Sequence, residues 1–454
     1  MTDCDYLPTA KNDEVVSSAM QESIEHPSVS IFREYLRIPS VHPDVNYDEC
    51  VKFIKKQANS LGLLWMVYSC TPGNPVVVLT WTGTQPELPS VLLNSHMDVV
   101  PAYPDKWTHD PFAAEKDDQG NIYGRGAQDM KSVGIQYLEA IRRLKKNGVK
   151  LKRTVHVSFV PDEEGGDNGM CKFVNTSEFK SLNVGCSLDE ARASPEDYFY
   201  VYYGERTIWK PVVTCTGDTG HGSAFVKNTA ANKARIIIDR FLDWRQQELD
   251  KLQSDASLTV SDVTTVNLTT LSGGVQMNVV PAEIKLGFDI RLSSNNDFDI
   301  VSEKLEGFCQ EAGEARSWKA SVGDWGGHLL IYVVGCDRVD EKLEGFCREA
   351  GEGTSITYVS KNPIVSPTCI DSSNPWWTAF KHAADKMGVH LKPIITPGGT
   401  DSRFLRKVGI SAFGFSPMNN TPTLLHDNDE FLNEKVFLRG IDIYYGIIKS
   451  LANH

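Results

Sequence analysis

The sequence predicts an α/β fold, in which a mainly parallel sheet carries helices on both faces and an α+β domain with an antiparallel sheet is inserted into the chain. Up to about residue 203, strand-like apolar runs alternate with helical stretches, which is typical of a parallel sheet covered by helices. From 204 to 361 the runs look like strands of an antiparallel sheet with helices between them. From 362 to 454 the chain returns to helices and loops, so this segment is expected to complete the first domain.

The first domain is expected to begin with two helices and four strands. A polar stretch, 1–25, is expected to be a flexible tail, and a first amphipathic helix is expected within 26–41. A second helix is predicted over 130–148 and is closed by Gly148. The strands are "PVVVLTW" at 75–81, "SVLLNSH" at 90–96, "RTVHVSFV" at 153–160 and "VGCSLDE" at 184–190. Functional residues are expected at the carboxyl ends of such strands.

The inserted domain contains a duplicated segment. Its strands are expected in "WKPVVTCTG", "TTVNLTTLSGG", "AEIKLGFDIRL" and "TSITYVSK", and its helices at 231–252 and 299–313. The segment "EKLEGFCQEAGE" at 303–314 recurs as "EKLEGFCREAGE" at 341–352. Nothing else repeats at that period, so this is not a solenoid. We expect only one copy to pack in the original groove of the sheet.

Composition and charge narrow the classes of partner. The net charge of −13 argues against nucleic acid or an anionic membrane as the main partner, and a small molecule is expected instead. The ten cysteines are scattered without a CxxC pair, which is typical of reduced thiols. The N-terminus lacks the apolar core of a signal peptide, and the longest apolar runs are too short to span a bilayer. A cytoplasmic protein is the resulting expectation.

Histidines and acids recur at the expected strand ends. His96 and Asp98 lie two residues apart in "NSHMDVVP", so both can face the same side of an extended strand. Each candidate alone has a plain structural explanation, such as a polar pair, a helix cap, a solvated acidic stretch or a surface loop. The further candidates are Asp129, Asp162, Glu163, Glu164, Asp189, Glu190 and His426. Together, two histidines and several carboxylates suit a divalent ion such as zinc.

The chain resembles a known family of enzymes. The segments "LLNSHMDVVP", "YGRGAQDMKSVGIQYLEAIRRLK", "FVPDEEGG" and "GFSPMNNTPTLLHDNDE" resemble those of the aminoacylases, which are N-acyl-L-amino-acid amidohydrolases. These belong to the dinuclear zinc aminopeptidase-like and carboxypeptidase-like hydrolases. The resemblance covers nearly all of the chain from about residue 26, excluding one copy of the duplicated helix and its linker. It implies an enzyme with two Zn²⁺ per subunit that hydrolyses N-acyl-L-amino acids.

The resemblance also implies a role for each candidate residue at the metal centre. His96 and Asp189 would hold one zinc, and Glu164 and His426 would hold the other. Asp129 would bridge the two ions. Asp98 would orient His96 as an outer partner. Glu163 would be the general base, because a carboxylate committed to zinc cannot also move protons.

Substrate recognition is expected to involve both domains. The inserted domain of this family acts as a lid and a dimer contact, which implies a homodimer in which His221 reaches the partner subunit's site. Thr219 departs from the family's proline-glycine-histidine loop, so the stiffness of this loop is left open. Arg291 is expected to bind the substrate carboxylate as a bidentate fork. Its expected neighbours are Asn278 and the backbone around Gly399 and Thr400.

Two other functions stay open at this point. A dipeptidase or carboxypeptidase of the same family would use the same two zinc ions, and an inactive homologue would only bind acylated amino acids. Other sites are excluded, because the chain has no complete dinucleotide fingerprint, no P-loop and no G-x-S-x-G motif. His109 and His156 have no partner at ligand spacing and are expected to be structural.

Overall fold

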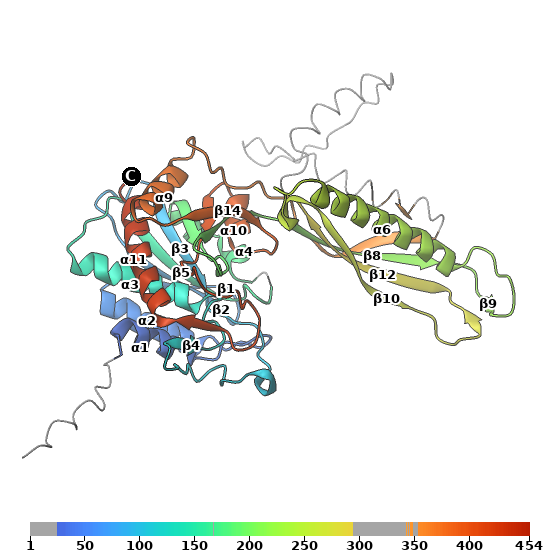
Figure 1. The fold of residues 1–454 in the computed structure, drawn as a ribbon, viewed down its shortest axis with the longest axis horizontal. Helices are drawn as coiled ribbons and strands as arrows, with labels where there is room; N and C mark the ends of the chain where they lie inside the picture. Colours follow the sequence, from blue (N-terminus) through green and yellow to red (C-terminus); the bar gives the residue numbers. More distant parts are fainter. Residues whose placement is uncertain (1–24, 167, 294–341, 343, 345, 348–352) are drawn as a thin grey trace, which may run out of the picture.

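The protein consists of two units, each built on its own sheet, as Figure 1 shows. The computed structural model describes residues 25–166, 168–293, 342, 344, 346–347 and 353–454. The larger unit contains an eight-stranded sheet, and the smaller one contains a four-stranded sheet with one long helix along it. The chain passes to the smaller sheet after Glu205 and returns to the larger unit after Lys361.

The large sheet is mixed, and its central strands are parallel. Its order is β1 (Leu64–Thr71), β2 (Asn74–Trp81), β5 (Val155–Val160), β3 (Ser90–His96), β6 (Val184–Asp189), β15 (Ser411–Gly414), β7 (Phe199–Glu205) and β14 (Leu391–Thr396). Strands β5, β3, β6 and β15 run in one direction. Strands β2 and β7 run against them, and a two-residue turn joins β1 to β2 as an antiparallel pair. The prediction of a mainly parallel sheet covered by helices is therefore confirmed.

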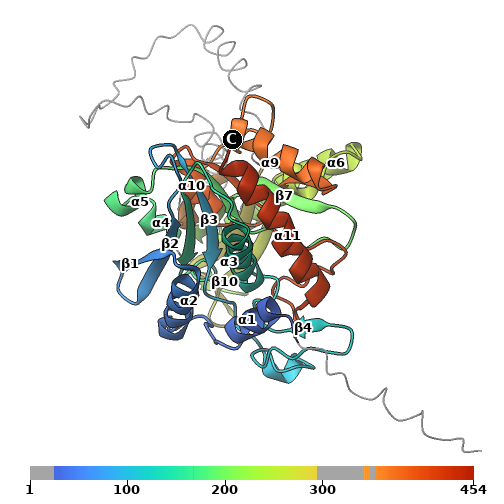
Figure 2. The same cartoon turned by 90° about the vertical axis from the view of Figure 1, so that its left-hand side faces the viewer.

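Helices cover both faces of this sheet, and Figure 2 shows the two layers from the side. One face carries α1 (Pro27–Leu36), α2 (Asp48–Leu61), α3 (Lys131–Lys146), α9 (Pro375–Lys386) and α11 (Glu434–Leu451). The other carries α4 (Met170–Phe173), α5 (Ser177–Ser181) and α10 (Ser402–Lys407). Strand β2 shows why both faces need cover. Its Val77 and Leu79 pack in the first layer, whereas Val76 and Val78 pack in the second.

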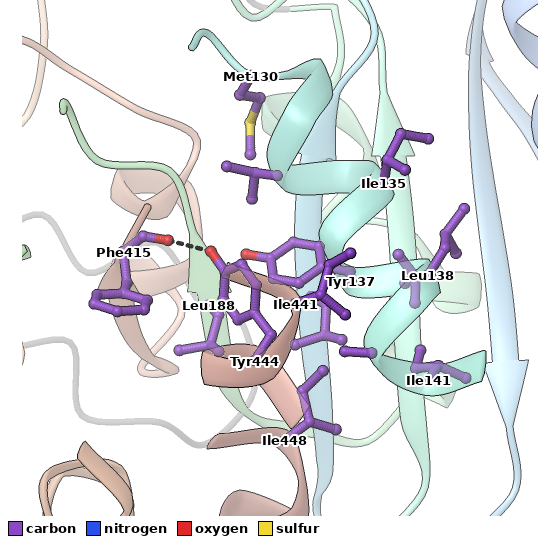
Figure 3. Packing of buried hydrophobic residues seen from close by; sticks show 14 of the residues in the cluster. Met130, Ile135, Tyr137, Leu138, Ile141, Leu188, Phe415, Ile441, Tyr444 and Ile448 are labelled. Carbon is purple, nitrogen blue, oxygen red and sulfur yellow. Dashed lines mark hydrogen bonds between the residues drawn. The ribbon is translucent and has the colours of Figure 1, made fainter. Parts of the chain in front are cut away.

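Helix α3 is fixed against the sheet and against α11. At Gly134 a Cβ atom would lie 2.8 Å from Phe159 and from Ser95, so only glycine allows this close approach to the strands. Figure 3 shows Tyr137 of α3 beside α11. In α11 the Tyr444 hydroxyl donates a hydrogen bond to the Phe415 carbonyl. The start of α3 is therefore held rigidly beside the ends of the central strands.

The smaller unit is an antiparallel sheet with a helix on one face. The sheet order is β10 (Thr265–Gly273), β12 (Glu283–Leu292), β8 (Thr207–Thr216) and β13 (Thr354–Lys361). Helix α6 (Ala230–Ser254) packs on it, and Phe241 stacks on Phe288 at 3.7 Å between ring centroids. Short elements complete the chain: β4 (Asn121–Tyr123) with β16 (Phe431–Asn433), β9 (Gly220–His221) with β11 (Val279–Val280), η1 (Pro104–Lys106) and η2 (Val260–Asp262). The predicted antiparallel sheet is confirmed.

Two parts of the chain lie outside the described residues. One is the tail 1–24, and the other, in the inserted domain, includes the expected helix at 299–313 and the first copy of the repeat at 303–314. In the second copy, at 341–352, Phe346 lies 5.3 Å from Phe241, between ring centroids. None of the described helices is long and apolar enough to cross a bilayer.

Candidate metal centre

Polar side chains converge at the carboxyl ends of the parallel strands. His96 is the last residue of β3, Glu163 and Glu164 follow β5, and Glu190 follows β6. Because β3 lies between β5 and β6, all these ends meet at one edge of the sheet. Asp129 comes from the segment before α3, and His426 comes from the loop between β15 and β16. The topology thus gathers five segments of the chain at one place.

Asp129 lies between the two histidines. Its Oδ1 is 3.0 Å from His96 Nε2, and its Oδ2 is 3.3 Å from His426 Nε2. His426 Nε2 is also 3.1 Å from Glu164 Oε2. The His96 and Asp129 side chains are buried, whereas that of His426 is 49% exposed. One carboxylate therefore faces a buried histidine with one oxygen and an accessible histidine with the other, which is the arrangement expected of a bridging ligand.

Glu190, and not Asp189, contacts the buried histidine. Glu190 Oε2 lies 3.5 Å from His96 Nε2. The Asp189 oxygens instead accept hydrogen bonds from Asn94 Nδ2 at 3.2 Å and Ser402 Oγ at 2.9 Å. The prediction of Asp189 as the partner of His96 disagrees with this geometry. The physical reason is the alternation of side chains at the end of β6, which sends consecutive residues to different sides.

Donor atoms of two groups lie close enough together to hold a cation. His96, Asp129 and Glu164 form one group, and His96, Glu163 and Glu190 form the other, with the ligand atoms of each within 4.8 Å of one another. Imidazole nitrogen with carboxylate oxygen is a donor set that suits zinc and similar divalent ions. The residues therefore fit the metal that the sequence predicts.

The electrostatics of the cluster favour bound positive charge. Burial, together with the nearby Asp401 and Glu164 carboxylates, raises the pKa of Glu163 well above its usual range. Burial and the Asp129 carboxylate also raise the pKa of Glu190. Hydrogen bonds to Asp129 and Glu164 raise the pKa of His426 to about 10. The crowding of negative charge that raises these pKa values also favours a bound divalent cation.

Asp98 fixes the turn that carries Glu163 and Glu164. The Asp98 carboxylate accepts hydrogen bonds from the backbone N–H groups of Glu163 at 3.3 Å and Glu164 at 2.9 Å, and lies 2.7 Å from His42 Nε2. His96 Nδ1 lies 2.8 Å from the Asp98 carbonyl oxygen but 3.8 Å from its carboxylate. The expected contact between the Asp98 side chain and His96 is therefore replaced by a backbone contact. His42 was not predicted, since no spacing links it to this motif.

Glu430 ties together the two loops that provide Asp129 and His426. This fully buried carboxylate accepts hydrogen bonds from the backbone N–H groups of Gly126 at 3.1 Å, Gln128 at 2.6 Å and Asp129 at 3.2 Å. It also forms an ion pair with Arg125 at 2.8 Å. Glu430 follows His426 by four residues, so it anchors both loops at once. The acidic segment "HDNDE" gave no signal of this role, because such segments are usually solvated.

The predicted substrate residues lie in different parts of the molecule. Thr400 is buried and donates its Oγ1 hydrogen to Glu205 Oε1 at 2.7 Å, and Gly399 precedes it. Arg291 on β12 donates to Asp289 through Nε at 2.7 Å and Nη2 at 3.1 Å. His221 and Asn278 are exposed. Figure 1 shows β9, which contains His221, at the end of the smaller unit that is remote from the large sheet. Within one chain His221 is therefore not part of the cluster.

Comparison with known proteins places the chain among metallopeptidases and their relatives. The model of peptidase family M20/M25/M40 matches residues 92–450. Aminoacylase-1 of Mus musculus is 46% identical over 432 residues, which cover 94% of this chain and 96% of that protein. Aminoacylase-1 of Homo sapiens gives the same identity and coverage, and that of Dictyostelium discoideum is 43% identical over 442 residues, covering 94% of this chain and 98% of that protein.

Solved structures share the fold. An M20 family metallo-carboxypeptidase from Sulfolobus solfataricus matches with a TM-score of 0.67 and 19% identity, covering 94% of this chain and all of that one (100%). A dinuclear metal-binding peptidase of the M20 family from Bacillus subtilis matches with a TM-score of 0.62 and 16% identity, covering 94% of this chain and 97% of that one. At such low sequence identity, these matches show only that the fold, with its two units, is shared.

Proposed function

Because the chain belongs to peptidase family M20/M25/M40, we propose that it is a metal-dependent amidohydrolase that cleaves N-acyl-L-amino acids into a carboxylate and a free L-amino acid. The observation that carries this proposal is the half-buried Glu163, whose ligand atom lies within 4.8 Å of those of His96 and Glu190. A protein that only binds acylated amino acids needs no such proton acceptor. The likeness to aminoacylase-1 over 94% of the chain supports this substrate class.

We propose that the centre holds two zinc ions. His96 and Glu190 would hold one ion, Glu164 and His426 would hold the other, and Asp129 would bridge them. This assignment replaces Asp189 by Glu190, because both Asp189 oxygens are engaged by Asn94 and Ser402. When bound, the metal pair would polarise the amide carbonyl and lower the pKa of a water.

Glu163 would move the proton during hydrolysis. The water oxygen bonds to the amide carbon, and Glu163 accepts the proton that this water loses. The carbon–nitrogen bond then breaks, and Glu163 delivers the proton to the departing amine nitrogen. The turn held by Asp98 keeps Glu163 in position, since its backbone N–H donates to Asp98 Oδ1.

The reaction can be tested with matched substrates. We expect kcat/KM of the purified protein to be ~100-fold higher for N-acetylmethionine than for simple dipeptides. These two kinds of substrate differ only in the group on the acyl side of the amide bond, so the comparison measures the preference for that group. Removing the metal with a chelator should abolish the activity, and added Zn²⁺ should restore it. A higher kcat/KM on dipeptides would favour a dipeptidase, and a metal-loaded protein that hydrolyses neither would favour an inactive homologue.

We propose that Arg291 binds the free carboxylate of the substrate. Asp289 fixes the plane of its guanidinium through two hydrogen bonds. Arg291→Lys should lower kcat/KM for N-acetylmethionine by ~10- to 100-fold, because lysine cannot form a bidentate pair. The same variant should act like the wild type on N-acetylmethionine amide, which lacks the carboxylate. Equal kcat/KM of both proteins on the acid would remove Arg291 from the substrate site.

We propose a homodimer that pairs through the smaller unit, so that His221 enters the partner subunit's site. Phe225, Val275 and Met277 are exposed in the loops on either side of β9 and β11, and exposed apolar side chains of this kind mark interaction sites. His221→Asn and Glu163→Gln should each be inactive. Co-expressed, they should recover about a quarter of the wild-type activity, because half of the dimers are mixed and each mixed dimer has one intact site.

Recovery of activity on co-expression distinguishes a shared active site from a purely structural role of His221. Sedimentation should show dimers for both variants and for their mixture. An active monomer, or mixed dimers without recovered activity, would contradict the shared site.

We also propose that the protein acts in the cytoplasm, in amino acid metabolism. The ten scattered cysteines without a CxxC pair, which are typical of reduced thiols, support this location. Cell fractionation that recovers the protein with membranes or outside the cell would contradict it.

A further inference from the structure

The histidine that contacts Asp98 comes from a segment remote in sequence from the predicted metal ligands. Residues 40–42 run alongside the chain that leaves β3. The Val99 N–H donates a hydrogen bond to the Ser40 carbonyl at 2.9 Å, and the His42 N–H donates one to the Val99 carbonyl at 3.1 Å. These two backbone bonds set the position of His42 relative to the end of β3.

The hydrogen bond from His42 completes the set of donors around a buried carboxylate. Asp98 is fully buried, and its two oxygens accept hydrogen bonds from the backbone N–H groups of Glu163 at 3.3 Å and Glu164 at 2.9 Å. His42 Nε2, at 2.7 Å from Asp98 Oδ2, is the third donor. Among the residues that the structure describes, no other side chain donates a hydrogen bond to Asp98. Loss of this imidazole would therefore leave a buried charge with backbone donors alone.

The imidazole ring of His42 also packs on the turn that follows β5. A Cβ atom at Gly165 would lie 2.3 Å from His42 Cε1, so the ring lies directly against the backbone of this glycine. His42 Nε2 is 3.9 Å from Asp162 Oδ1, and only 13% of the His42 side chain is exposed. The ring is thus near the turn at both of its ends, and it reaches the middle of the turn through Asp98.

The turn needs such support because its backbone is strained at the first residue. Asp162 has a φ of 61°, in the left-handed region that residues other than glycine seldom adopt. Its N–H donates to the Tyr47 hydroxyl at 3.0 Å, and its Oδ2 accepts from Asn168 N at 3.1 Å and Nδ2 at 2.8 Å. These bonds fix the start of the turn, whereas the backbone of Glu163 is held by Asp98.

We propose that His42 is a positioning residue for the hydrolysis, which keeps Glu163 in place by donating a hydrogen bond to Asp98. Without this donor the Asp98 carboxylate is free to turn away from the Glu163 N–H. A displacement of a reacting group by about 1 Å lowers turnover by about 100-fold. The inference rests on the proposed role of Glu163 as the base. Because His42 acts through Asp98 and not on the substrate, its loss should change kcat and not KM.

Two substitutions of His42 separate the hydrogen bond from the packing of the ring. His42→Phe keeps an aromatic ring beside Gly165 but donates nothing, and it should lower kcat for N-acetylmethionine by ~10- to 100-fold. His42→Gln keeps a side-chain N–H donor and should retain kcat to within about threefold. Both should keep the wild-type KM and metal content. His42→Ala, which cannot clash with Asp98, should behave as His42→Phe does.

Hydrogen exchange gives a readout that needs no substrate. Because Asp98 accepts from the Glu163 and Glu164 N–H groups, these amides should exchange ~10-fold faster in His42→Phe and at the wild-type rate in His42→Gln. The control is His382→Phe, which changes an exposed histidine of α9 and should leave kcat and this exchange unaltered. Thermal unfolding verifies that each compared variant is folded.

Three results would overturn the proposal. The first is an equal loss of kcat in His42→Gln and His42→Phe, which would make the ring and not the donated hydrogen bond the cause. The second is the wild-type kcat in His42→Phe, and the third is a loss of metal that accounts for its lower activity. If the wild-type protein did not cleave N-acetylmethionine, the proposed function would fail, and exchange at Glu163 and Glu164 would still decide whether His42 holds the turn.

Discussion

Glu163→Gln is expected to lower the turnover of N-acetylmethionine by ~10³-fold, because the amide of glutamine cannot accept a proton from water or return it to the amine. The change keeps the size of the side chain, and its backbone N–H can still donate to Asp98. The residues proposed as metal ligands, His96, Asp129 and Glu190, are untouched. Both ions should therefore remain bound, and elemental analysis after dialysis should give the wild-type metal content alongside the loss of kcat.

The neighbouring Glu164→Gln provides the matched contrast. Glu164 lies 3.1 Å from His426, and these two residues are proposed to hold one ion together, so the loss of the Glu164 carboxylate should reduce the metal content as well as activity. If the Glu163→Gln protein lost metal, Glu163 would be a metal ligand. If this protein kept the wild-type kcat, Glu163 would be excluded as the base. The pair of variants thus separates proton transfer from metal binding at two adjacent positions.

The central strands could be predicted because apolar runs in the sequence indicate them. "SVLLNSH" coincides with β3 at Ser90–His96, and all of its residues are buried, as expected for a strand in the middle of a sheet covered on both faces. Once β3, β5 and β6 are recognised as parallel neighbours, their carboxyl ends must meet. The edge of the sheet at which the candidate histidine and acids gather therefore followed from the apolar patterns of the strands.

The side of the sheet that a single side chain faces could not be predicted in the same way. "LDE" places Asp189 and Glu190 next to each other, and the end of a strand cannot be located from the sequence to within one residue. A shift of one position exchanges the two sides of the sheet. The contacts of Asp189 with Asn94 and Ser402 come from distant parts of the chain, so only the folded structure reveals them.

Residues that act through the backbone were also missed. Glu430 and His42 hold loops in place through hydrogen bonds to N–H groups or to Asp98, and neither lies at a spacing typical of metal ligands. Such roles depend on which loops meet in space.

Glu190→Gln should weaken one of the two metal sites by ~100-fold or more, because it replaces the carboxylate that lies 3.5 Å from His96 by a neutral amide. Asp189→Asn should leave two ions per chain, since the Asp189 oxygens contact Asn94 and Ser402 and belong to neither metal-binding group. Metal content after dialysis against a graded chelator measures both variants, and circular dichroism verifies that each is folded. A folded Asp189→Asn that loses an ion while Glu190→Gln keeps both would restore Asp189 as the ligand. Because the two acids are adjacent in sequence and equal in charge, the long-range field of the protein is the same in both variants, and only the direction of each side chain can separate their effects.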